Sequence, residues 1–343
     1  GSGVANEVAD LLGPSLFPDH RQPYLHQRNV FQRVLVEHQD AAVTTGTGSG
    51  KTGCFLVPVL AELIRESRQW FAPNPRTATW DWWDDRHRTM RGRNPRYAQH
   101  VAQRAQENRP AAVRALLLYP LNALVEDKLV RLRLTLDSAA ARTWLDTHRN
   151  GNRIYFGRYT SRTPIPGRSD TGRLRKELRE LAREAAAVAG SDAAVFFQTL
   201  DIGSAEMWSR WDMQDHPPDL LITNYSMLNI MLMRSIEVGI FDQTRAWLAA
   251  DSSRVFHLVV DELHTYRGTP GTEVAYLLRV LLDRLGLSPD SEQLRIIASS
   301  ASLDSGESGS EYLQSFFVRE RSRFAIVDSA TTAPRPTALS ACG

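Results

Sequence analysis

The sequence predicts an α/β domain in which helices cover both faces of a mainly parallel sheet. Short apolar runs recur along its 343 residues, and each is continuously apolar, as expected of strands buried on both faces. The runs lie at 41–45, 115–120, 153–157, 220–224, 255–260 and 295–300. Segments with helical periodicity separate them, and strands that alternate with helices indicate a parallel sheet covered on both sides.

Each predicted helix follows one of these strands and repeats its apolar residues every three or four positions. The helices are predicted at 53–65, 121–136, 173–188, 227–236, 272–285 and 311–319. Two insertions lengthen the pattern. Residues 66–110 carry four tryptophans and many arginines, which could stack bases and bind phosphates, or could fold onto the main body. Residues 161–218 contain GRLRKELRELAREAAAV, which is either a solvated amphipathic helix or a surface for DNA.

Composition excludes several classes of protein. The longest apolar runs fall far short of the about 18 residues that cross a membrane, and 42% hydrophobic residues suffice for a large core. Lysine and arginine outnumber aspartate and glutamate by 41 to 39, which permits nucleic-acid binding without requiring it. The cysteines, Cys54 and Cys342, have no metal-ligand spacing, so a reducing, cytoplasmic location is the default. Lys51 stands out because Lys128 and Lys176 are the only other lysines.

The segment TGTGSGKT at 45–52, between a predicted strand and a predicted helix, indicates a phosphate-binding loop for ATP. Its glycines let successive backbone N–H groups turn inward. The residues expected around the phosphates are Thr47, Gly48, Ser49 and Gly50. Lys51 is expected to reach the β- and γ-phosphates, and Thr52 to offer its hydroxyl to Mg²⁺. Thr45 stands where the strict pattern has glycine, but the strand–loop–helix context outweighs that departure.

The segment DELH at 261–264 follows an apolar strand and places two carboxylates at its end. Asp261 is expected to hold Mg²⁺ through its water shell, and Glu262 to polarise the attacking water. His264 either links the γ-phosphate to a distant binding surface or is a structural hydrogen-bonding residue. With the phosphate loop upstream, this acidic pair predicts a site that hydrolyses ATP.

These motifs together resemble the first RecA-like motor domain of superfamily 2 helicases of the DExH kind. The Q motif, in which Gln27 would hydrogen-bond the adenine edge, is matched by PYLHQRNVF. Motifs I, Ia, Ib, Ic, II and III are matched by TGTGSGKT, LYPLNALVEDKL, FGRYTSRTP, LLITNYSML, DELH and SSAS. Three segments resemble the YprA-like branch of this superfamily, namely YPLNALVED, ITNYSML and DELHTYRGTPGTEVAYLLR. That branch includes the large helicase subunit of DISARM-type anti-phage defence.

The resemblance implies a RecA-like P-loop NTPase domain over 19–327, with ATP and Mg²⁺ as cofactors. It also implies a sequence-tolerant surface for nucleic acid, expected to be DNA, at the sheet edge. The candidate residues of that surface are Pro120, Asn122, Arg158, Thr160, Thr223, Asn224 and Arg267. The alternative role is turn chemistry for Thr223 and Asn224, and a structural salt bridge for Arg158 and Arg267. Ser300 and Ser302 of SSAS would couple the two sites.

Superfamily 2 enzymes use a second RecA-like domain whose arginines reach the transition state, and the sequence after Ser302 shows no such domain. We therefore expect a helicase fragment that binds ATP but turns it over slowly, because a missing arginine costs about 10³–10⁵ in rate. Residues 1–18 are expected to be a tag remnant and lead-in, and 328–343 a disordered tail.

Two other functions would use the same motifs. One is an ATP-driven translocase that moves along duplex DNA within a restriction-like complex. The other is a nucleotide-gated scaffold whose 66–110 insertion docks a partner protein. The resemblance favours a role in phage defence or DNA repair, with a possible partner subunit of a defence complex and no membrane.

Overall fold

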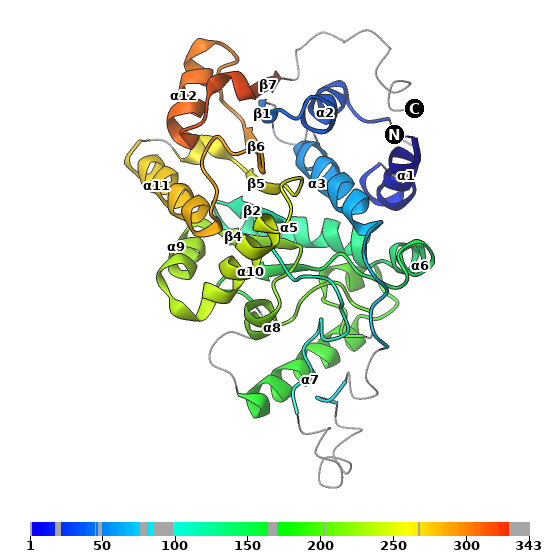
Figure 1. Ribbon diagram of the computed structural model, residues 1–343. Coiled ribbons are helices and arrows are strands. Elements are labelled where there is room, and N and C mark those ends of the chain that lie inside the picture. Colours follow the sequence, from blue (N-terminus) through cyan, green and yellow to red (C-terminus); the bar gives the residue numbers. More distant parts are fainter. Residues whose placement is uncertain are drawn as a thin grey trace.

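Seven strands, among the residues that the structure describes, form one parallel sheet in the computed structural model (Figure 1). The described residues are 2–17, 22–44, 46, 50–75, 81–84, 99–163, 170–201, 203–266 and 268–328. The strands are β1 (Asp40–Thr44), β2 (Ala115–Tyr119), β3 (Phe156–Tyr159), β4 (Leu220–Asn224), β5 (Phe256–Val260), β6 (Leu294–Ser300) and β7 (Phe324–Asp328). They lie in the order β3-β4-β2-β5-β6-β1-β7, and every neighbouring pair is parallel. The predicted α/β class is therefore confirmed.

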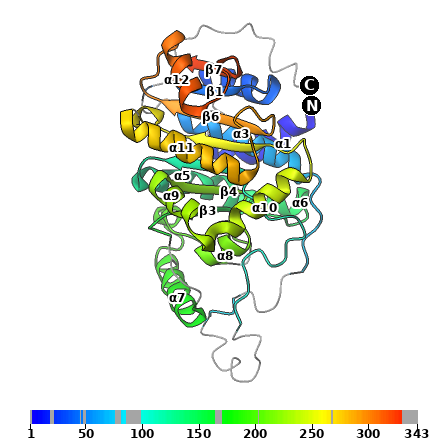
Figure 2. The same ribbon diagram turned by 60° about the vertical axis from the view of Figure 1, so that its left-hand side comes forward.

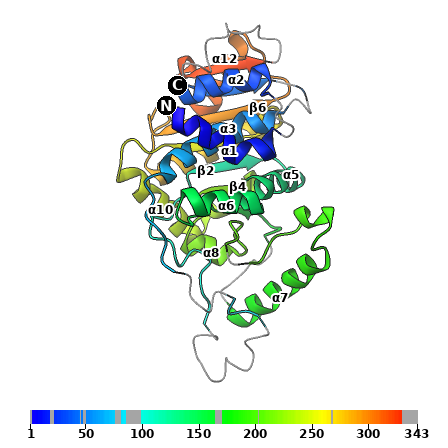
Figure 3. The same ribbon diagram turned by 90° about the vertical axis from the view of Figure 1, so that its right-hand side faces the viewer.

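One face of the sheet is covered by helices from the first half of the chain, which Figure 3 shows in front of the strands. They are α1 (Ser2–Leu16), α2 (Leu25–Phe31), α3 (Lys51–Ser67), α5 (Asn122–Leu132) and α6 (Ala139–His148). Helices from the second half cover the opposite face (Figure 2). They are α9 (Tyr225–Met233), α10 (Val238–Ala249), α11 (Gly268–Leu285) and α12 (Glu307–Phe317). Short π-helical segments, η2 (Gln32–Val36) and η5 (Arg133–Asp137), continue α2 and α5.

The central strands are continuously apolar because each contributes to a hydrophobic layer on both sides. On β2, Leu116 and Leu118 pack into the layer under α9, α10 and α11, while Ala115 and Leu117 pack into the layer under α3 and α5. Side chains alternate between the two faces of a strand, so a strand covered on both sides is apolar at most of its positions, and a polar exception such as His257 on β5 is itself buried. None of the described helices is long and apolar enough to span a membrane.

Several elements differ from the prediction, and helices α2, α6 and α10 lie outside the predicted helical segments. Strand β3 starts at Phe156 instead of 153, because the Tyr155 N–H donates to the Asp219 carboxylate at 2.8 Å and so lies outside the ladder. Strand β7 was not predicted, since it is an edge strand whose side chains are mostly half-buried. Helix α1 was also not predicted. Its Leu11 and Leu12 are buried where it packs on α3, so the expected lead-in is part of the core. The expected tail beyond Asp328 lies outside the described residues.

The aromatic part of the first insertion packs inside the protein. Trp82 and Trp83 are buried together with Trp208 and the apolar stripe of α7 (Thr171–Ala187), a helix that stands away from the sheet in Figure 3. Short helices precede the return to the sheet, η6 (Asp192–Phe196) and α8 (Arg210–Asp215). Trp80 lies outside the described residues. Trp82 and Trp83 thus pack against the second insertion, and because they are buried they cannot stack nucleobases.

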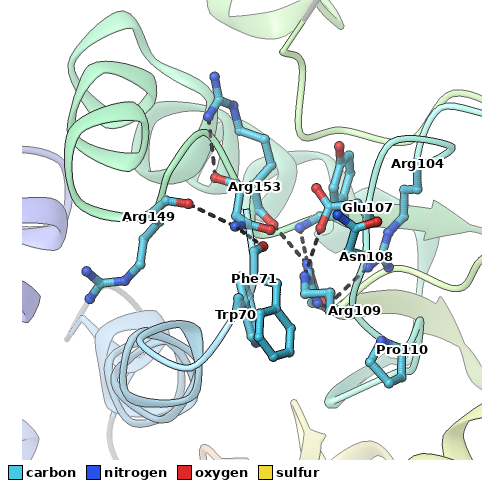
Figure 4. Close-up of polar contacts among 12 residues, drawn as sticks. Trp70, Phe71, Arg104, Glu107, Asn108, Arg109, Pro110, Arg149 and Arg153 are labelled. Carbon is cyan, nitrogen blue, oxygen red and sulfur yellow. Dashed lines mark hydrogen bonds and ion pairs between the residues drawn. The ribbon is translucent and has the colours of Figure 1, made fainter. Parts of the chain in front are cut away.

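A cluster of arginines fixes the end of the same insertion at the amino ends of β2 and β4. Arg109 donates two hydrogen bonds of 2.6 Å to the buried carboxylate of Asp219, and Arg114 donates a third at 3.0 Å. The Arg109 guanidinium also stacks on Trp70, 3.6 Å from the ring centroid (Figure 4). Burial alone would raise the pKa of Asp219, but the neighbouring guanidinium charges hold it well below its usual range. The carboxylate is therefore ionised and anchors residues 99–110.

Candidate nucleotide-binding site

The phosphate loop leaves β1 and enters α3 at the carboxyl edge of the sheet. Thr47, Gly48 and Ser49, three of the residues expected around the phosphates, lie outside the described residues, as does Thr45. Gly50 precedes α3 with a φ of 77°, in the left-handed region that favours glycine. A side chain there would meet Gln27, because a Cβ atom would lie 2.8 Å from Gln27 Nε2.

Gln27 supports the end of this loop. Its side-chain amide donates to Gly50 O at 2.8 Å, and its carbonyl oxygen accepts from the Tyr24 N–H at 2.8 Å. The side chain is buried. The expected contact of Gln27 with the adenine edge stays a prediction, and the observed bonds show that the same residue positions the start of α3.

Lys51, the first residue of α3, carries an ammonium group with no hydrogen-bond partner in the part of the chain that the structure describes. Its side chain is only 10% exposed, and Glu262 Oε1 lies 3.7 Å from Nζ, too far for a hydrogen bond. Among the described residues no atom accepts a hydrogen bond from Lys51 Nζ. A buried cation without acceptors is costly, and anionic phosphate oxygens would supply the missing bonds. The site therefore fits a nucleotide.

The acidic pair follows β5 at the same edge of the sheet. Asp261 is buried and accepts a hydrogen bond from the Ser299 hydroxyl of β6. The Glu262 N–H lies 3.1 Å from Asp261 Oδ1 and 3.3 Å from Ser299 Oγ. Glu262 has a φ of 52°, which for a non-glycine residue costs about 1–3 kcal/mol and is typical of functional sites. This backbone turn aims the Glu262 side chain toward Lys51.

His264 lies between the acidic pair and the end of β6. Its Nδ1 atom is 3.2 Å from Glu262 Oε2 and 3.3 Å from the Ala301 N–H. The nitrogen can accept from Ala301 only when it is unprotonated, and can donate to Glu262 only when it is protonated. His264 thus contacts both DELH and SSAS, while its expected role in linking the γ-phosphate to a distant binding surface stays a prediction.

The SSAS segment contacts the acidic pair through Ser299, a residue that the sequence analysis did not single out. Ser300, at the end of β6, accepts a hydrogen bond from the Ser302 N–H at 3.3 Å, so both expected coupling residues are in one turn. Ser299 instead contacts Asp261. Strand alternation could have identified it, because neighbouring serines on a strand point to opposite faces.

Thr52 and Asp261 stay the residues predicted to hold Mg²⁺. Hydroxyl and carboxylate oxygens are the ligands that magnesium prefers, and both residues follow strands at the carboxyl edge, where ligands of open α/β sheets bind. The Thr52 hydroxyl accepts a 2.7 Å hydrogen bond from Lys128 Nζ of α5. Lys128 was not predicted at the site, although it is one of three lysines and belongs to LYPLNALVEDKL.

Two buried side chains, Tyr119 and Cys54, lie near the charged residues Asp261 and Lys51. Burial, together with the nearby Asp261 charge, raises the pKa of Tyr119 well above its ordinary value. Cys54 is fully buried, and burial raises the pKa of its thiol to about 12. Both groups are therefore neutral at physiological pH and contribute a low-dielectric surrounding to the charged residues.

A polar edge lies beside this site, where β2, β3 and β4 end. Asn224 Nδ2 donates to Asn122 Oδ1 at 2.7 Å, and Asn122 Nδ2 donates to Ser161 Oγ at 3.2 Å. Asn224 also caps α9 by accepting from the Met227 N–H at 2.8 Å, which is the turn chemistry expected as its alternative role. Pro120 and Asn122 are partly exposed. The structure thus brings the candidates for nucleic-acid contact together.

Three other candidates at this edge are engaged within the protein. Thr160 and Thr223 are fully buried, and the Thr223 hydroxyl donates to Tyr159 O at 2.7 Å. Neither hydroxyl is placed to reach a phosphate, so any contact would have to use other atoms of these residues. Arg158 pairs with Glu126 of α5, the structural salt bridge expected as its alternative role. Arg267 lies outside the described residues.

Comparison with known proteins agrees with this geometry. Residues 24–153 match the family of DEAD/DEAH box helicases. Residues 24–153 thus belong to a DEAD/DEAH box helicase domain. It is 34% identical over 359 aligned positions to Druantia protein DruE of Escherichia coli (strain UMEA 4076-1), a match that covers 91% of this chain and 17% of DruE. The helicase domain is thus a small part of the length of that relative.

Solved structures show the same fold. The DUF1998 helicase MrfA bound to DNA and AMPPNP is similar with a TM-score of 0.50 and 19% identity, over 94% of this chain and 29% of that chain. MrfA bound to DNA gives a TM-score of 0.49 and 18% identity, over 94% and 29%. At this identity the likeness concerns the fold of the helicase domain, and the RecA-like architecture predicted from the motifs is confirmed.

Proposed function

We propose that this chain is the first motor domain of an ATP-dependent DNA helicase and that Lys51, Thr52, Asp261 and Glu262 form its hydrolysis site. The observation that carries the proposal is the Lys51 ammonium, which is buried, 3.7 Å from Glu262, and lacks a hydrogen-bond acceptor among the described residues. A cation held in this way at the end of a phosphate-loop strand is prepared for phosphate oxygens.

Each residue has a distinct role in this proposal. Lys51 binds the β- and γ-phosphates, and Thr52 and Asp261 hold Mg²⁺, which when bound neutralises phosphate charge. Ser299 holds the Asp261 carboxylate in place by its hydrogen bond. Glu262, directed by its left-handed backbone, orients and polarises the attacking water. His264 connects Glu262 to the backbone of Ala301.

DNA is the proposed nucleic acid, and the polar edge is its proposed contact surface. Asn122, which is partly exposed, presents its side-chain amide there, and amide N–H groups suit phosphate oxygens and do not distinguish bases. Pro120 and Asn224 lie at the same edge, where Asn224 holds Asn122 through its own amide. The fold neighbour MrfA is solved bound to DNA, which supports this choice. By contrast, the buried Trp82 and Trp83 give no support to a scaffold that docks partners through the first insertion.

The biological setting we propose is phage defence or DNA repair in the cytoplasm. The resemblance to the YprA-like branch supports it, and so does the similarity to Druantia protein DruE. A duplex translocase would use the same site. Strand displacement by the complete protein distinguishes the two, because a translocase hydrolyses ATP on duplex DNA without separating its strands.

ATP turnover by this chain with saturating single-stranded DNA tests the proposal. We expect nucleotide binding with slow turnover, since the arginines of a second RecA-like domain would contribute about 10³–10⁵ in rate. In the longer protein, Glu262→Gln should retain ATP binding and abolish hydrolysis. Turnover of several per second by the chain alone would contradict the proposed need for a second domain, and full activity of Glu262→Gln would contradict the role of Glu262.

A further inference from the structure

Lys128 lies at the nucleotide site but has no role in the hydrolysis scheme above. Its Nζ atom donates to Thr52 Oγ1 at 2.7 Å and lies 3.4 Å from Asp127 Oδ2. The Lys128 side chain is 14% exposed, whereas that of Lys176 on α7 is 75% exposed. Ordering a lysine side chain costs about 1.5–2 kcal/mol, so a partly buried lysine directed at one hydroxyl indicates a specific interaction.

The hydroxyl that Lys128 contacts is the one proposed to bind magnesium. Magnesium binds oxygen at about 2.0–2.1 Å and demands near-ideal octahedral geometry. An ammonium hydrogen-bonded to the same oxygen would lie within about 4 Å of the ion. Two unit positive charges at that distance repel by about 4 kcal/mol at an effective dielectric constant of 20, and a divalent ion doubles the repulsion. Lys128 and the metal therefore cannot share Thr52 Oγ1.

We propose that Lys128 is a competing cation of the nucleotide site, whose ammonium holds the Thr52 hydroxyl and gives way when a metal–nucleotide complex binds. This inference rests on the proposed function, since competition requires Thr52 to be a metal ligand. Asp127, whose side chain is 63% exposed, offers the released ammonium a partner on the solvent side. For a nucleotide without metal, the same ammonium supplies positive charge beside the phosphates.

The proposal separates Lys128 from two ordinary roles by its effect on metal dependence. A lysine that only binds phosphate, as Lys51 is proposed to do, would favour nucleotide with or without metal. A lysine that only packs α5 against α3 would change both affinities equally through the fold. A competing cation favours metal-free nucleotide and opposes metal-bound nucleotide, so its removal changes the two affinities in opposite directions.

The experiment measures the dissociation constant of a fluorescent ADP analogue by anisotropy, once in excess EDTA and once in saturating MgCl₂. The variants are Lys128→Ala, Lys128→Gln and, as the control, Lys176→Ala. We expect both Lys128 variants to weaken binding in EDTA and to tighten it in MgCl₂. The dissociation constant in EDTA divided by that in MgCl₂ should then rise about tenfold relative to wild type. A factor of this size corresponds to the loss of one charged hydrogen bond. Lys176→Ala should keep the wild-type ratio.

Lys128→Gln keeps an amide donor near Thr52, so its agreement with Lys128→Ala would show that the charge, not the hydrogen bond, is responsible. Thermal melting identifies any variant that does not fold. If one Lys128 variant fails to fold, the dissociation constants of the other Lys128 variant test the competition. An unchanged ratio, or affinities that fall together in EDTA and MgCl₂, would overturn the competition. Wild-type chain that binds no nucleotide under either condition would instead overturn the proposed function.

Discussion

Asp219→Ala removes the carboxylate around which buried arginines gather at the amino ends of β2 and β4. The variant leaves Arg109 and Arg114 without three hydrogen bonds of 2.6, 2.6 and 3.0 Å, and the Tyr155 N–H without its acceptor at 2.8 Å. Removing one partner of a buried ion pair costs about 3–5 kcal/mol, and an orphaned buried donor about 1–3 kcal/mol. Because these effects overlap, we expect a loss of about 4–6 kcal/mol in the free energy of unfolding.

Urea unfolding followed by circular dichroism measures this loss at pH 7, and Asp242→Ala on the exposed face of α10 is the matched control. The control should change the free energy of unfolding by no more than about 0.5 kcal/mol. In a thermal scan, Asp219→Ala should lower Tm by about 10 °C. Nucleotide affinity of the folded variant should not change, since Asp219 precedes β4 at the edge of the sheet opposite Lys51.

The effect of Asp219→Ala should also depend on pH. The arginines hold the pKa of the Asp219 carboxyl below its usual value, so its contribution is present above the unfolded pKa of about 3.9. It is lost as the pH falls through the folded pKa. The difference between wild type and variant should therefore be complete at pH 7 and shrink below about pH 4. A loss under 1 kcal/mol at pH 7, or one that grows in acid, would refute this reasoning.

Three further predictions concern the site itself. Ser299→Ala should raise the magnesium concentration needed for nucleotide binding about tenfold, because Asp261 loses its hydrogen-bond donor; an unchanged magnesium titration would count against that contact. Gly53→Ala places a methyl group 2.7 Å from Gln27 Nε2 and should weaken nucleotide binding several-fold, which equal affinity in a titration would disprove. Native Cys54, whose pKa burial raises to about 12, should resist iodoacetamide at pH 8 until the chain unfolds; rapid labelling of its peptide by mass spectrometry would show otherwise.

The strands were the most predictable part of the fold. The strands at 220–224 and 295–300 each contain a run of apolar residues, at 220–222 and 296–298, because helices cover both faces, and this pattern needs no knowledge of tertiary structure. Strand β7 lacks that pattern because it lies at the sheet edge and is half-buried. The start of β3 depends on Asp219, 64 residues further along the chain from Tyr155, and no local pattern reports such a contact.

The site was predictable where chemistry and strand position coincide. Lys51 and Glu262 were both expected at strand ends, and the carboxyl ends of parallel strands share one edge, so their contact follows from the topology. Lys128 was missed because its contact with Thr52 joins residues 76 positions apart in the sequence, on α5 and α3, and no local pattern reports such a contact. The direction of the Thr223 hydroxyl was not predictable either, since a polar residue at a strand end can point inward.

Nucleotide binding by Lys51→Ala tests the central claim most directly. The measurement is calorimetric titration of the chain with a magnesium–ATP analogue, with Lys176→Ala as a control that removes an exposed lysine of α7. We predict that Lys51→Ala folds, binds DNA as wild type does, and loses nucleotide affinity at least about 100-fold, as expected when a cation leaves a phosphate site. Equal affinity of Lys51→Ala and wild type for the analogue would contradict the phosphate-binding site on which the proposed function depends.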